Sequence, residues 1–378
     1  MTAKRILHVK PGEWSTGGVE SFVMSMLENV DRDRVRFDLL TIGDRTGPSP
    51  HDDRLSELGG TRFSIVEPTH GPALSKLGPI RSLFDLVRHH GYGTVHIHTG
   101  SAFHALYAGT ARLAGARTVV LHSHTAVRPE LAVPVRRGLD ALLRVGPTHR
   151  FACSRAAARA LFPATAQPGV RILRNGIDVA GFRYDPGVRE QVRAALGIVP
   201  GQLVLGHVGR FSWEKNHALL LRVFAEVARR SSGDGPQPLL LCIGDGEERA
   251  ATEALAAGLG IAGQVRFLGV RHDIARLLQA MDVFLLPSRN EGLGIAGVEA
   301  QAAGLPCVCS TGVPDEIDVT GRCSFLPDTA DPADWADAVA AAASLPRVDT
   351  AGQVAAAGYD AADCARQLQD FYLRGEPA

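Results

Sequence analysis

The chain has 378 residues, which is enough for two domains that each bury a hydrophobic core. Lys and Arg together number 40, as do Asp and Glu, so no overall field steers the protein toward nucleic acid or an anionic membrane. The six cysteines form no C-x-x-C pair and lie among apolar or small residues. This setting favours reduced core thiols over zinc ligands or disulfides.

No apolar run reaches the roughly 18–20 residues that a membrane-spanning helix needs. The N-terminus also lacks the apolar core of a signal peptide. We therefore expect a cytoplasmic protein, as either a monomer or a homodimer.

The first half of the chain alternates short apolar runs with helical patterns at the spacing of β-α-β units. Strands are predicted at 5–9, 37–42, 62–66, 94–98, 117–122, 151–154 and 170–173. Helices are predicted up to about residue 27 and at 52–58, 80–89, 102–113 and 155–161. The alternation predicts an α/β domain with a doubly wound parallel sheet.

A glycine-rich loop follows the first predicted strand. Gly17 and Gly18 would let the backbone approach a ligand closely at the start of a helix, and Glu20 lies in its first turn. The alternative is an ordinary turn. The G-x-G-x-x-G pattern of dinucleotide-binding folds is absent.

Four histidines lie at the carboxyl ends of two predicted strands, where open α/β sheets bind ligands. They are His96, His98, His122 and His124. His-x-His can form a metal site, but no acidic cluster with matching spacing follows, so we expect no metal. Satisfied structural histidines are the default interpretation.

Five arginines alternate with apolar residues between Arg128 and Arg150. This segment could be a basic amphipathic helix at a membrane surface or beside a polyanionic acceptor. We favour a helix that packs on the sheet and keeps its arginines solvated. The stretch that follows, up to Pro200, has the turn punctuation of a connection between domains.

The second half restarts the alternation. Strands are predicted at 203–208, 239–243, 265–268, 283–286 and 305–309, and helices at 218–230, from 247, around 299, at 332–343 and at 360–372. Arg210 and Lys215 follow the first of these strands and could converge on a diphosphate, with solvated surface cations as the alternative. Gly244 forms a strand-to-glycine turn after the second.

A strand, a glycine-rich turn and a helix start occur together between residues 283 and 300. Because the first amides of a helix are unpaired and lie at its positive end, this turn predicts an anion site. Its residues are Gly292, Leu293, Gly294 and Ile295. Glu291 and Glu299 flank the turn and suit hydroxyl groups of a ribose or hexose, unless they are a solvated loop acid and a capping acid.

The frame S-x-x-E-G-x-G-x-x-x-x-E-A-x-A-x-G-L-P, from Ser288 to Pro306, resembles retaining glycosyltransferase family 4, which has the GT-B fold. The segments GRFSWEKN and NGID also resemble that family. HSHT followed by FACS resembles its exopolysaccharide-type members. Natural-product members of the aminoglycoside type are a second resemblance.

The resemblance implies two Rossmann-like domains that face a cleft. Residues 1–182 would form an acceptor domain and residues 183–357 a nucleotide-sugar donor domain. The C-terminal helix, 358–378, would pack back on the first domain. The fold would serve transfer of a hexose or N-acetylhexosamine from a nucleoside-diphosphate sugar, with UDP favoured, to a hydroxyl group.

The resemblance also assigns roles to residues. His124, Glu291, Arg210 and Lys215 would be catalytic, and Glu20, His122 and His124 would lie on the acceptor side. The donor would be bound by Gly17, Gly18, Arg210, Lys215, Gly244, Val270, Arg271, Glu291, Gly292, Leu293, Gly294, Ile295 and Glu299. No metal or other cofactor is expected, because no D-x-D motif lies in a plausible loop.

Several alternatives stay open. The acceptor could be a lipid-linked saccharide or a small aminocyclitol or other natural product, and the protein could associate peripherally with the inner face of a membrane. A nucleotide-sugar 2-epimerase shares the two-domain architecture but needs no acceptor. A non-catalytic nucleotide-sugar-binding protein would bind without turnover.

Overall fold

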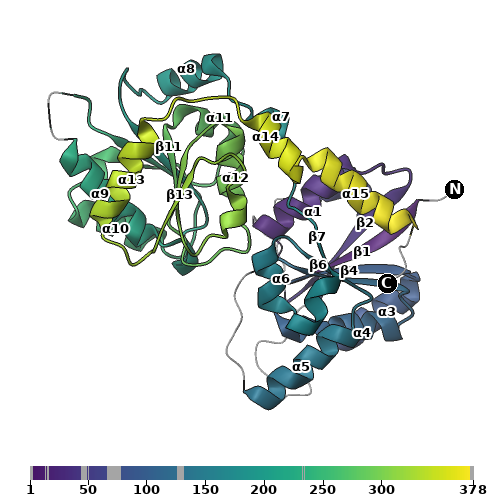
Figure 1. Cartoon of the computed structure of the whole chain (residues 1–378). Helices are drawn as coiled ribbons and strands as arrows, with labels where there is room; N and C mark the ends of the chain where they lie inside the picture. Colours follow the sequence, from purple (N-terminus) through teal and green to yellow (C-terminus); the bar gives the residue numbers. More distant parts are fainter. Residues whose placement is uncertain are drawn as a thin grey trace. The chain divides into compact units, whose positions relative to one another are not determined.

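The computed structural model describes residues 3–12, 14, 17–43, 49, 51–65, 78–125, 132–231, 233 and 235–374 (Figure 1). Contacts group the chain into two compact units. The first is Met1–Gly176 with Ala361–Ala378, and the second is Ile177–Asp360. The sequence had placed the division after residue 182 and the start of the returning segment at 358.

The first unit holds a seven-stranded parallel sheet in the order β3-β2-β1-β4-β5-β6-β7. Its strands are β1 (Lys4–Pro11), β2 (Val35–Ile42), β3 (Arg62–Ile65), β4 (Thr94–Thr99), β5 (Thr118–Ser123), β6 (His149–Ala152) and β7 (Val170–Ile172). Its helices are α1 (Gly18–Asn29), α2 (Asp52–Glu57), α3 (Gly78–His90), α4 (Ala105–Leu113), α5 (Val133–Val145), α6 (Arg155–Leu161) and α15 (Ala361–Arg374).

Alternating side chains of this sheet feed two cores, as strand geometry requires. Ile6 and Phe37 join the core under α1 and α15, which also contains Tyr372. Leu7 and Ile97 join the core on the other face, with residues of α3 and α4. The last helix of the chain is therefore part of the first unit's core.

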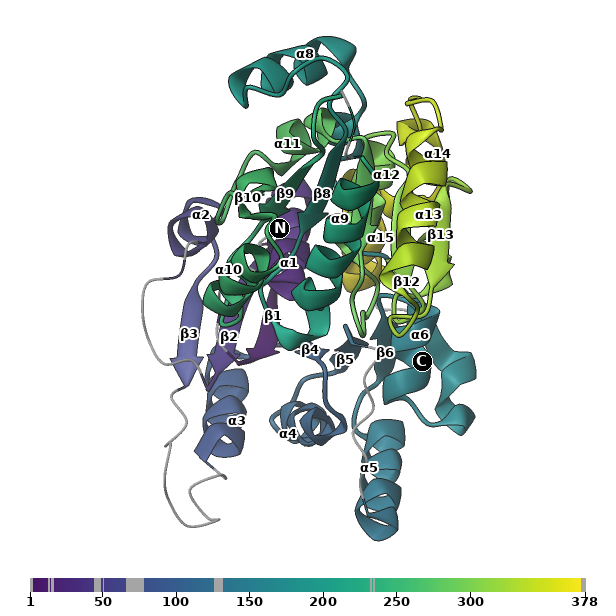
Figure 2. The same ribbon diagram turned by 90° about the vertical axis from the view of Figure 1, so that its left-hand side faces the viewer.

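The second unit holds a six-stranded parallel sheet in the order β10-β9-β8-β11-β12-β13. Its strands are β8 (Val204–Val208), β9 (Leu239–Ile243), β10 (Val265–Phe267), β11 (Val283–Leu286), β12 (Cys307–Ser310) and β13 (Cys323–Leu326), and Figure 2 shows the first three side by side. Its helices are α7 (Val179–Phe182), α8 (Pro186–Ala195), α9 (His217–Arg230), α10 (Arg249–Gly258), α11 (Ile274–Ala280), α12 (Ile295–Ala302), α13 (Pro332–Ala343) and α14 (Ala351–Val354).

Both sheets have the Rossmann strand order. The second and third strands are added outward on one side of the first strand, and the fourth and later strands are added on its other side, so the order of addition reverses there. The reversal lies between β1 and β4 in the first unit and between β8 and β11 in the second. Ligands of open α/β sheets bind at the carboxyl ends of the strands beside this point. The predicted fold class is confirmed.

Some elements differ from the predictions. The segment that we interpreted as an interdomain connection contains α8, because Asp185 caps that helix by accepting from the amides of Gly187 at 2.7 Å and Val188 at 3.1 Å. Asp-Pro here starts a helix, with Pro186 in its first turn, whereas we had interpreted it as a turn.

The basic segment differs too. Its helix, α5, ends at Val145, and Arg150 belongs to β6, so the segment is not one continuous helix. Residues 126–131, including Arg128, lie outside the described part. Within that part, no helix is both long and apolar enough to cross a bilayer.

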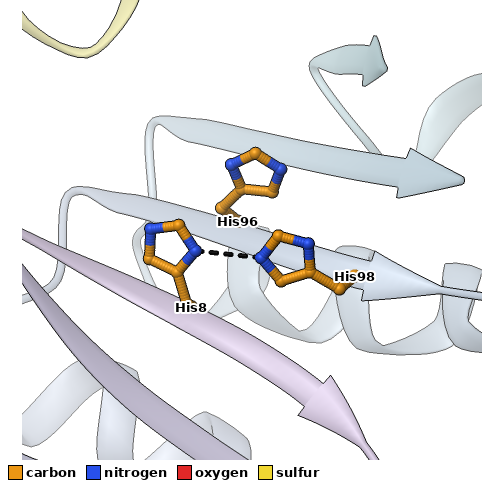
Figure 3. Close-up of side chains that lie close together, drawn as sticks. All are labelled: His8, His96 and His98. Carbon is orange, nitrogen blue, oxygen red and sulfur yellow. Dashed lines mark hydrogen bonds between the residues drawn. The ribbon is translucent and has the colours of Figure 1, made fainter. Parts of the chain in front are cut away.

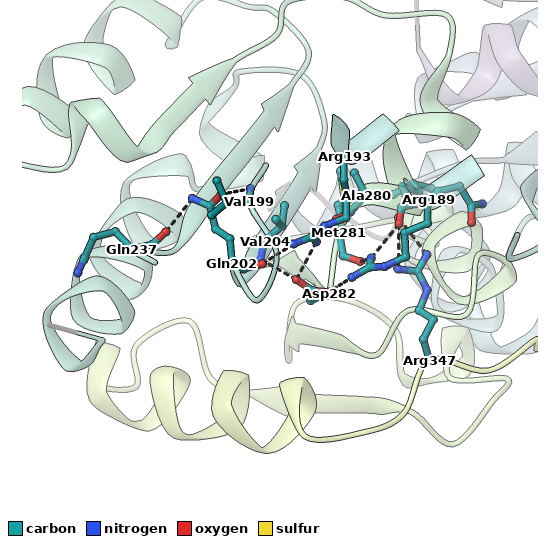
Figure 4. A network of polar contacts seen from close by, with 12 residues as sticks. Arg189, Arg193, Val199, Gln202, Val204, Gln237, Ala280, Met281, Asp282 and Arg347 are labelled. Atoms are coloured by element: carbon teal, nitrogen blue, oxygen red, sulfur yellow. Dashed lines mark hydrogen bonds and ion pairs between the residues drawn. The ribbon is translucent and has the colours of Figure 1, made fainter. Parts of the chain in front are cut away.

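An arginine network anchors α8 at the amino ends of β8 and β11 (Figure 4). Arg189 and Arg193 of α8 lie 2.5 Å and 3.4 Å from the carboxylate oxygens of Asp282, which directly precedes β11. Arg347 donates to the carbonyl oxygens of Leu278 and Met281, and burial lowers its pKa to about 9. The guanidinium donors thus bind the Asp282 carboxylate and carbonyl oxygens at the end of α11. The network is structural, and it lies at the opposite edge of the sheet from the carboxyl ends of the strands.

Candidate active site

Lys215 and Glu291 form an ion pair between the loops that follow β8 and β11. Nζ of Lys215 lies 2.5 Å from Oε1 of Glu291, which also accepts from the Ser288 hydroxyl at 2.7 Å. Their side chains are 22% and 12% exposed, so the pair is largely withdrawn from water. The structure thus brings together a cation and an acid from two separate predicted motifs at the reversal point of the sheet.

Glu299 lies on α12 near this pair. Burial raises the pKa of its carboxyl group to about 7, and the Lys215 ammonium lowers it by less. Among the described residues, no hydrogen bond to the Glu299 carboxylate is found. A partly buried carboxyl group without a partner can accept from the hydroxyl groups of a ligand.

The glycine turn before α12 has the predicted geometry of a helix start. Gly294 has φ +88°, in the left-handed region that favours glycine, and directly precedes the helix at Ile295. The loop is closed by a hydrogen bond from the Glu291 amide to the Gly312 carbonyl at 3.0 Å. The helix start lies close to Glu291, because a Cβ atom on Gly294 would lie 3.7 Å from Cγ of Glu291, and the first amides of a helix form its positive end.

Gly244 has a structural reason to be glycine. Its φ is +132°, and a Cβ atom there would lie 2.0 Å from the carbonyl oxygen of Gly209. The loops after β8 and β9 thus touch backbone to backbone, and the Phe211 amide donates to the Asp245 carbonyl at 2.9 Å. The predicted contact of Gly244 with a donor stays a prediction.

Arg210 and Lys215 take different acidic partners. Nη2 of Arg210 lies 3.0 Å from Glu247, and the Arg210 side chain is 68% exposed. Arg271 is paired with Asp273 at 2.7 Å, and the neighbouring Val270 is exposed. The expected convergence of the two cations would require Arg210 to leave Glu247.

Glu20 of the first unit faces inward. It is 3% exposed, and its Oε1 lies 2.8 Å from Nζ of Lys10. Gly17 precedes α1, and a Cβ atom there would lie 2.7 Å from Oε2 of Glu20, whereas Gly18 has open space around it. Glu20 thus holds the glycine turn against β1, a role that the sequence pattern did not indicate.

The four predicted histidines come together with a fifth, His8, in a buried group that we call the histidine cluster. Strand register explains the grouping, since His8 on β1 lies opposite His96 on β4, and His98 lies opposite His122 on β5. Its members are His8, His96, His98, His122 and His124, and Figure 3 shows the first three. Candidate ligand atoms of two triads lie within 4.8 Å of one another.

Sequence reasoning missed two buried histidines of the second unit. Nδ1 of His207 donates to the Leu285 carbonyl at 2.9 Å, while the His217 ring stacks on Phe211 with centroids 4.0 Å apart. Burial lowers the pKa of His207 to about 4 and that of His217 to about 2, so both are neutral near pH 7. A histidine inside the apolar run of β8 was the signal that could have identified His207.

Comparisons with known proteins agree with this geometry. Residues 16–180 match the model of Glycosyltransferase Family 4, and residues 188–359 match that of Glycosyl transferases group 1. The putative glycosyltransferase EpsF of Bacillus subtilis is 33% identical over 98% of this chain and 96% of its own length. The chain belongs to glycosyltransferase family 4.

Other relatives match part of this glycosyltransferase or its fold. A D-inositol 3-phosphate glycosyltransferase of Saccharomonospora viridis is 37% identical, over 48% of this chain and 44% of that protein. The structure of HepE from Anabaena in complex with UDP and glucose has a TM-score of 0.74 at 20% identity, covering 98% of this chain and 99% of that one. WaaG, a glycosyltransferase involved in lipopolysaccharide biosynthesis, has a TM-score of 0.64 at 18% identity, over 98% and 97% of the two chains. These likenesses support the GT-B fold.

Proposed function

We propose that this glycosyltransferase moves a hexose or N-acetylhexosamine from a nucleoside-diphosphate sugar to a hydroxyl group, with retention of configuration and without a catalytic metal. The observation that carries the proposal is the Lys215–Glu291 pair, which lies beside Glu299 and the start of α12. UDP is the favoured nucleotide, because the HepE structures with this fold hold UDP or UDP-glucose. EpsF, named as a putative glycosyltransferase, supports the same reaction class.

The diphosphate would lie between the Lys215 ammonium and the amides of Gly292–Ile295. Charge-assisted hydrogen bonds from an ammonium and from helix-start amides are strong where water is excluded. Arg210 would add a bidentate contact after leaving Glu247. That exchange is inexpensive, because an exposed ion pair contributes about 1 kcal/mol or less.

Glu299 would accept from the ribose hydroxyls, and Glu291 from a hydroxyl group of the transferred sugar. The base would meet the backbone near Val270 and Arg271, which follow β10. Ser288 already donates to Glu291, so the Glu291 carboxylate keeps one oriented partner while it exchanges Lys215 for the donor.

In the proposed step the bond between the anomeric carbon and the diphosphate oxygen breaks, and the bond to the acceptor oxygen forms on the same face. The acceptor hydroxyl gives its proton to the departing phosphate oxygen. Lys215, Arg210 and the α12 amides neutralise the charge that develops on the leaving group. Before that transfer, His124, as a neutral imidazole, would accept a hydrogen bond from the acceptor hydroxyl and so orient it.

The acceptor is proposed to be a lipid-linked saccharide or a small natural product such as an aminocyclitol. Helix α5 bears on peripheral membrane association, because it exposes Val133 and Val135 beside Arg136 and Arg137. Sedimentation with vesicles of phosphatidylglycerol, compared with neutral vesicles, tests this association. An R136E/R137E variant should lose binding to the anionic vesicles if α5 carries it.

A thermal-shift screen of nucleoside diphosphates tests the donor assignment. We expect UDP to raise the melting temperature more than ADP or GDP, and acceptors are then screened with the best nucleotide sugar. Incubation with the donor alone separates the alternatives, since an epimerase would convert the sugar without an acceptor. Tight binding without turnover of any acceptor would favour a binding protein.

A further inference from the structure

The hydrogen bonds of the histidine cluster form two branches that meet at Tyr372, and each branch ends at a ring nitrogen without a partner among the described residues. The first branch starts at Tyr372 of α15, whose Oη lies 2.5 Å from Nδ1 of His96. Nε2 of His96 lies 3.1 Å from Nδ1 of His122. The branch stops there, because Nε2 of His122 is buried and has no partner within the described part of the chain.

The second branch starts at the same phenol oxygen, which lies 3.4 Å from Nε2 of His8. Nδ1 of His8 lies 2.9 Å from Nε2 of His98, the contact drawn in Figure 3. Nδ1 of His98 in turn lies 2.9 Å from Nε2 of His124. This branch ends at Nδ1 of His124, which is also buried and unpartnered among the described residues.

All five imidazoles are neutral at physiological pH. Burial lowers the pKa of His8 and His124 to about 3 and holds the pKa values of the other three well below their ordinary value. Phe22 packs against three of the rings, with centroids 5.3–5.8 Å away. A neutral imidazole has one N–H and one lone pair, so each ring must accept at one nitrogen and donate at the other.

The phenol has one proton, and it can donate to only one branch. If it donates to His96, then His96 donates to His122, which is left with a free N–H at Nε2. Tyr372 then accepts from His8, so the second branch ends in a lone pair on Nδ1 of His124. If the phenol donates to His8, every bond reverses. All five rings therefore share one tautomer, and the two ends always have opposite polarity.

The distances select the first arrangement. O–H donors make shorter hydrogen bonds than N–H donors, so the phenolic proton belongs in the 2.5 Å contact with His96, and the longer 3.4 Å contact is a weak hydrogen bond from the N–H of His8. We infer that Tyr372 is a positioning residue that, through this chain, holds His124 with an accepting Nδ1 and His122 with a donating Nε2. This role rests on the proposed function: an accepting Nδ1 on His124 suits a hydroxyl acceptor, which can donate a hydrogen bond to it before the proton passes to the leaving phosphate oxygen.

Long-range 1H–15N correlation NMR on the full chain with 15N-labelled histidine tests the inference, because it separates the two tautomers and the imidazolium. Single His→Gln variants of the cluster assign the signals. We expect all five rings as Nε2–H tautomers near pH 7. Different tautomers within the cluster, or imidazolium forms, would overturn the inference.

Tyr372→Phe removes the proton that links the branches, so His124 and His122 should shift to mixtures of tautomers. Tyr92→Phe is the matched control, since that buried phenol donates to Asp38 at 2.8 Å in the same unit. Unchanged tautomers in Tyr372→Phe would contradict the linkage. Should that variant not fold, His98→Gln interrupts the second branch alone, so only His124 should change and His122 should keep its Nε2–H.

Two further measurements separate the explanations. Titration of the wild-type chain with cobalt(II) should give no ligand-field absorption, and a spectrum that His98→Gln abolishes would show a metal site in place of the hydrogen-bond chain. The NMR experiment needs no nucleotide, whereas UDP is proposed to bind residues of the second unit. If the wild-type chain does not bind UDP, the proposed function is contradicted, whereas the inference about the histidine tautomers is unaffected.

Discussion

Lys215 owes its position to two motifs that lie far apart in the sequence. It follows β8, whereas its partner Glu291 follows β11, and the two strands are neighbours in the sheet. The carboxylate holds the ammonium at the sheet edge before any ligand arrives. A diphosphate brings more negative charge than Glu291, so it can take over the ammonium without a large movement of the lysine side chain.

Lys215→Ala should therefore weaken UDP binding and lower turnover while the chain stays folded. Removing one charged donor to a leaving group costs on the order of 3 kcal/mol, about a hundredfold in rate. Calorimetric titration with UDP and circular dichroism measure the two effects. Arg222→Ala, which removes an exposed cation of α9 in the same unit, should change neither.

Glu299 predicts a pH dependence of UDP binding. Its folded-state pKa of about 7 lies above the ordinary value, so the group is mostly protonated below pH 7. A protonated carboxyl group accepts hydrogen bonds from two ribose hydroxyls less well than a carboxylate, because one of its oxygens carries the proton. UDP affinity should rise as the pH increases through about 7, with release of a proton on binding. Calorimetric titrations with UDP in buffers of different ionisation enthalpy measure the number of protons released on binding.

Glu299→Gln is the control for this effect, because it keeps the shape and removes the titration. Its UDP affinity should be lower at about pH 8 and should lack the change centred near pH 7. An identical pH profile in the variant would assign the titration to another group, such as the nucleotide phosphate.

At the scale of elements, the strands that the sequence predicted best are apolar runs bounded by glycine or proline. The strands 239–243 and 283–286 are confirmed with the predicted bounds. The strand Cys323–Leu326 was missed because it is an edge strand with partly exposed residues and no clear alternation. Helix α8 was missed because Asp185-Pro186 fits both a turn and a helix start.

The site residues show the same division. The sequence identified the backbone features, the glycine turn and the start of α12, because they depend on local conformation. It did not identify the partners of Glu20 and Arg210, which are Lys10 and Glu247. Those pairings depend on contacts between separate elements, so a local pattern could not predict them.

Gly244→Ala tests the contact between the loops after β8 and β9. The Cβ atom would meet the Gly209 carbonyl oxygen in a backbone conformation that alanine rarely adopts, so we expect a loss of stability of about 3 kcal/mol. Gly258→Ala in α10 has nothing within 4 Å and should be neutral or stabilising. Denaturant unfolding compares the two, and equal stabilities would contradict the contact.

At the scale of the whole molecule, the chain builds two units with separate cores. The backbone leaves the first unit after Gly176 and returns to it at Ala361. Helix α15 then supplies Phe371 and Tyr372 to the core that contains Phe22 and Phe37. The core of the first unit is therefore completed by α15, which follows the second unit in the sequence.

Truncation after Asp360 should unfold the first unit and spare the second. Loss of α15 uncovers the large apolar side chains that it buries, whereas the residues proposed to hold the diphosphate and the ribose, from Arg210 to Glu299, lie in the second unit. Of the expected donor-binding residues, Gly17 and Gly18 lie in the first unit. Differential scanning calorimetry should show one remaining unfolding transition, and UDP should raise its midpoint temperature. At a UDP concentration of a hundred times Kd, binding adds about 2.7 kcal/mol to the free energy of unfolding. A truncated chain that keeps both transitions would refute this division.

The most direct test of the donor site is a crystal structure of the chain with UDP. We predict the diphosphate within hydrogen-bond distance of Nζ of Lys215 and of the amides of Gly292–Ile295, and the ribose hydroxyls on the Glu299 carboxylate. UDP bound elsewhere, with the Lys215–Glu291 pair intact and Glu299 without a partner, would contradict the account.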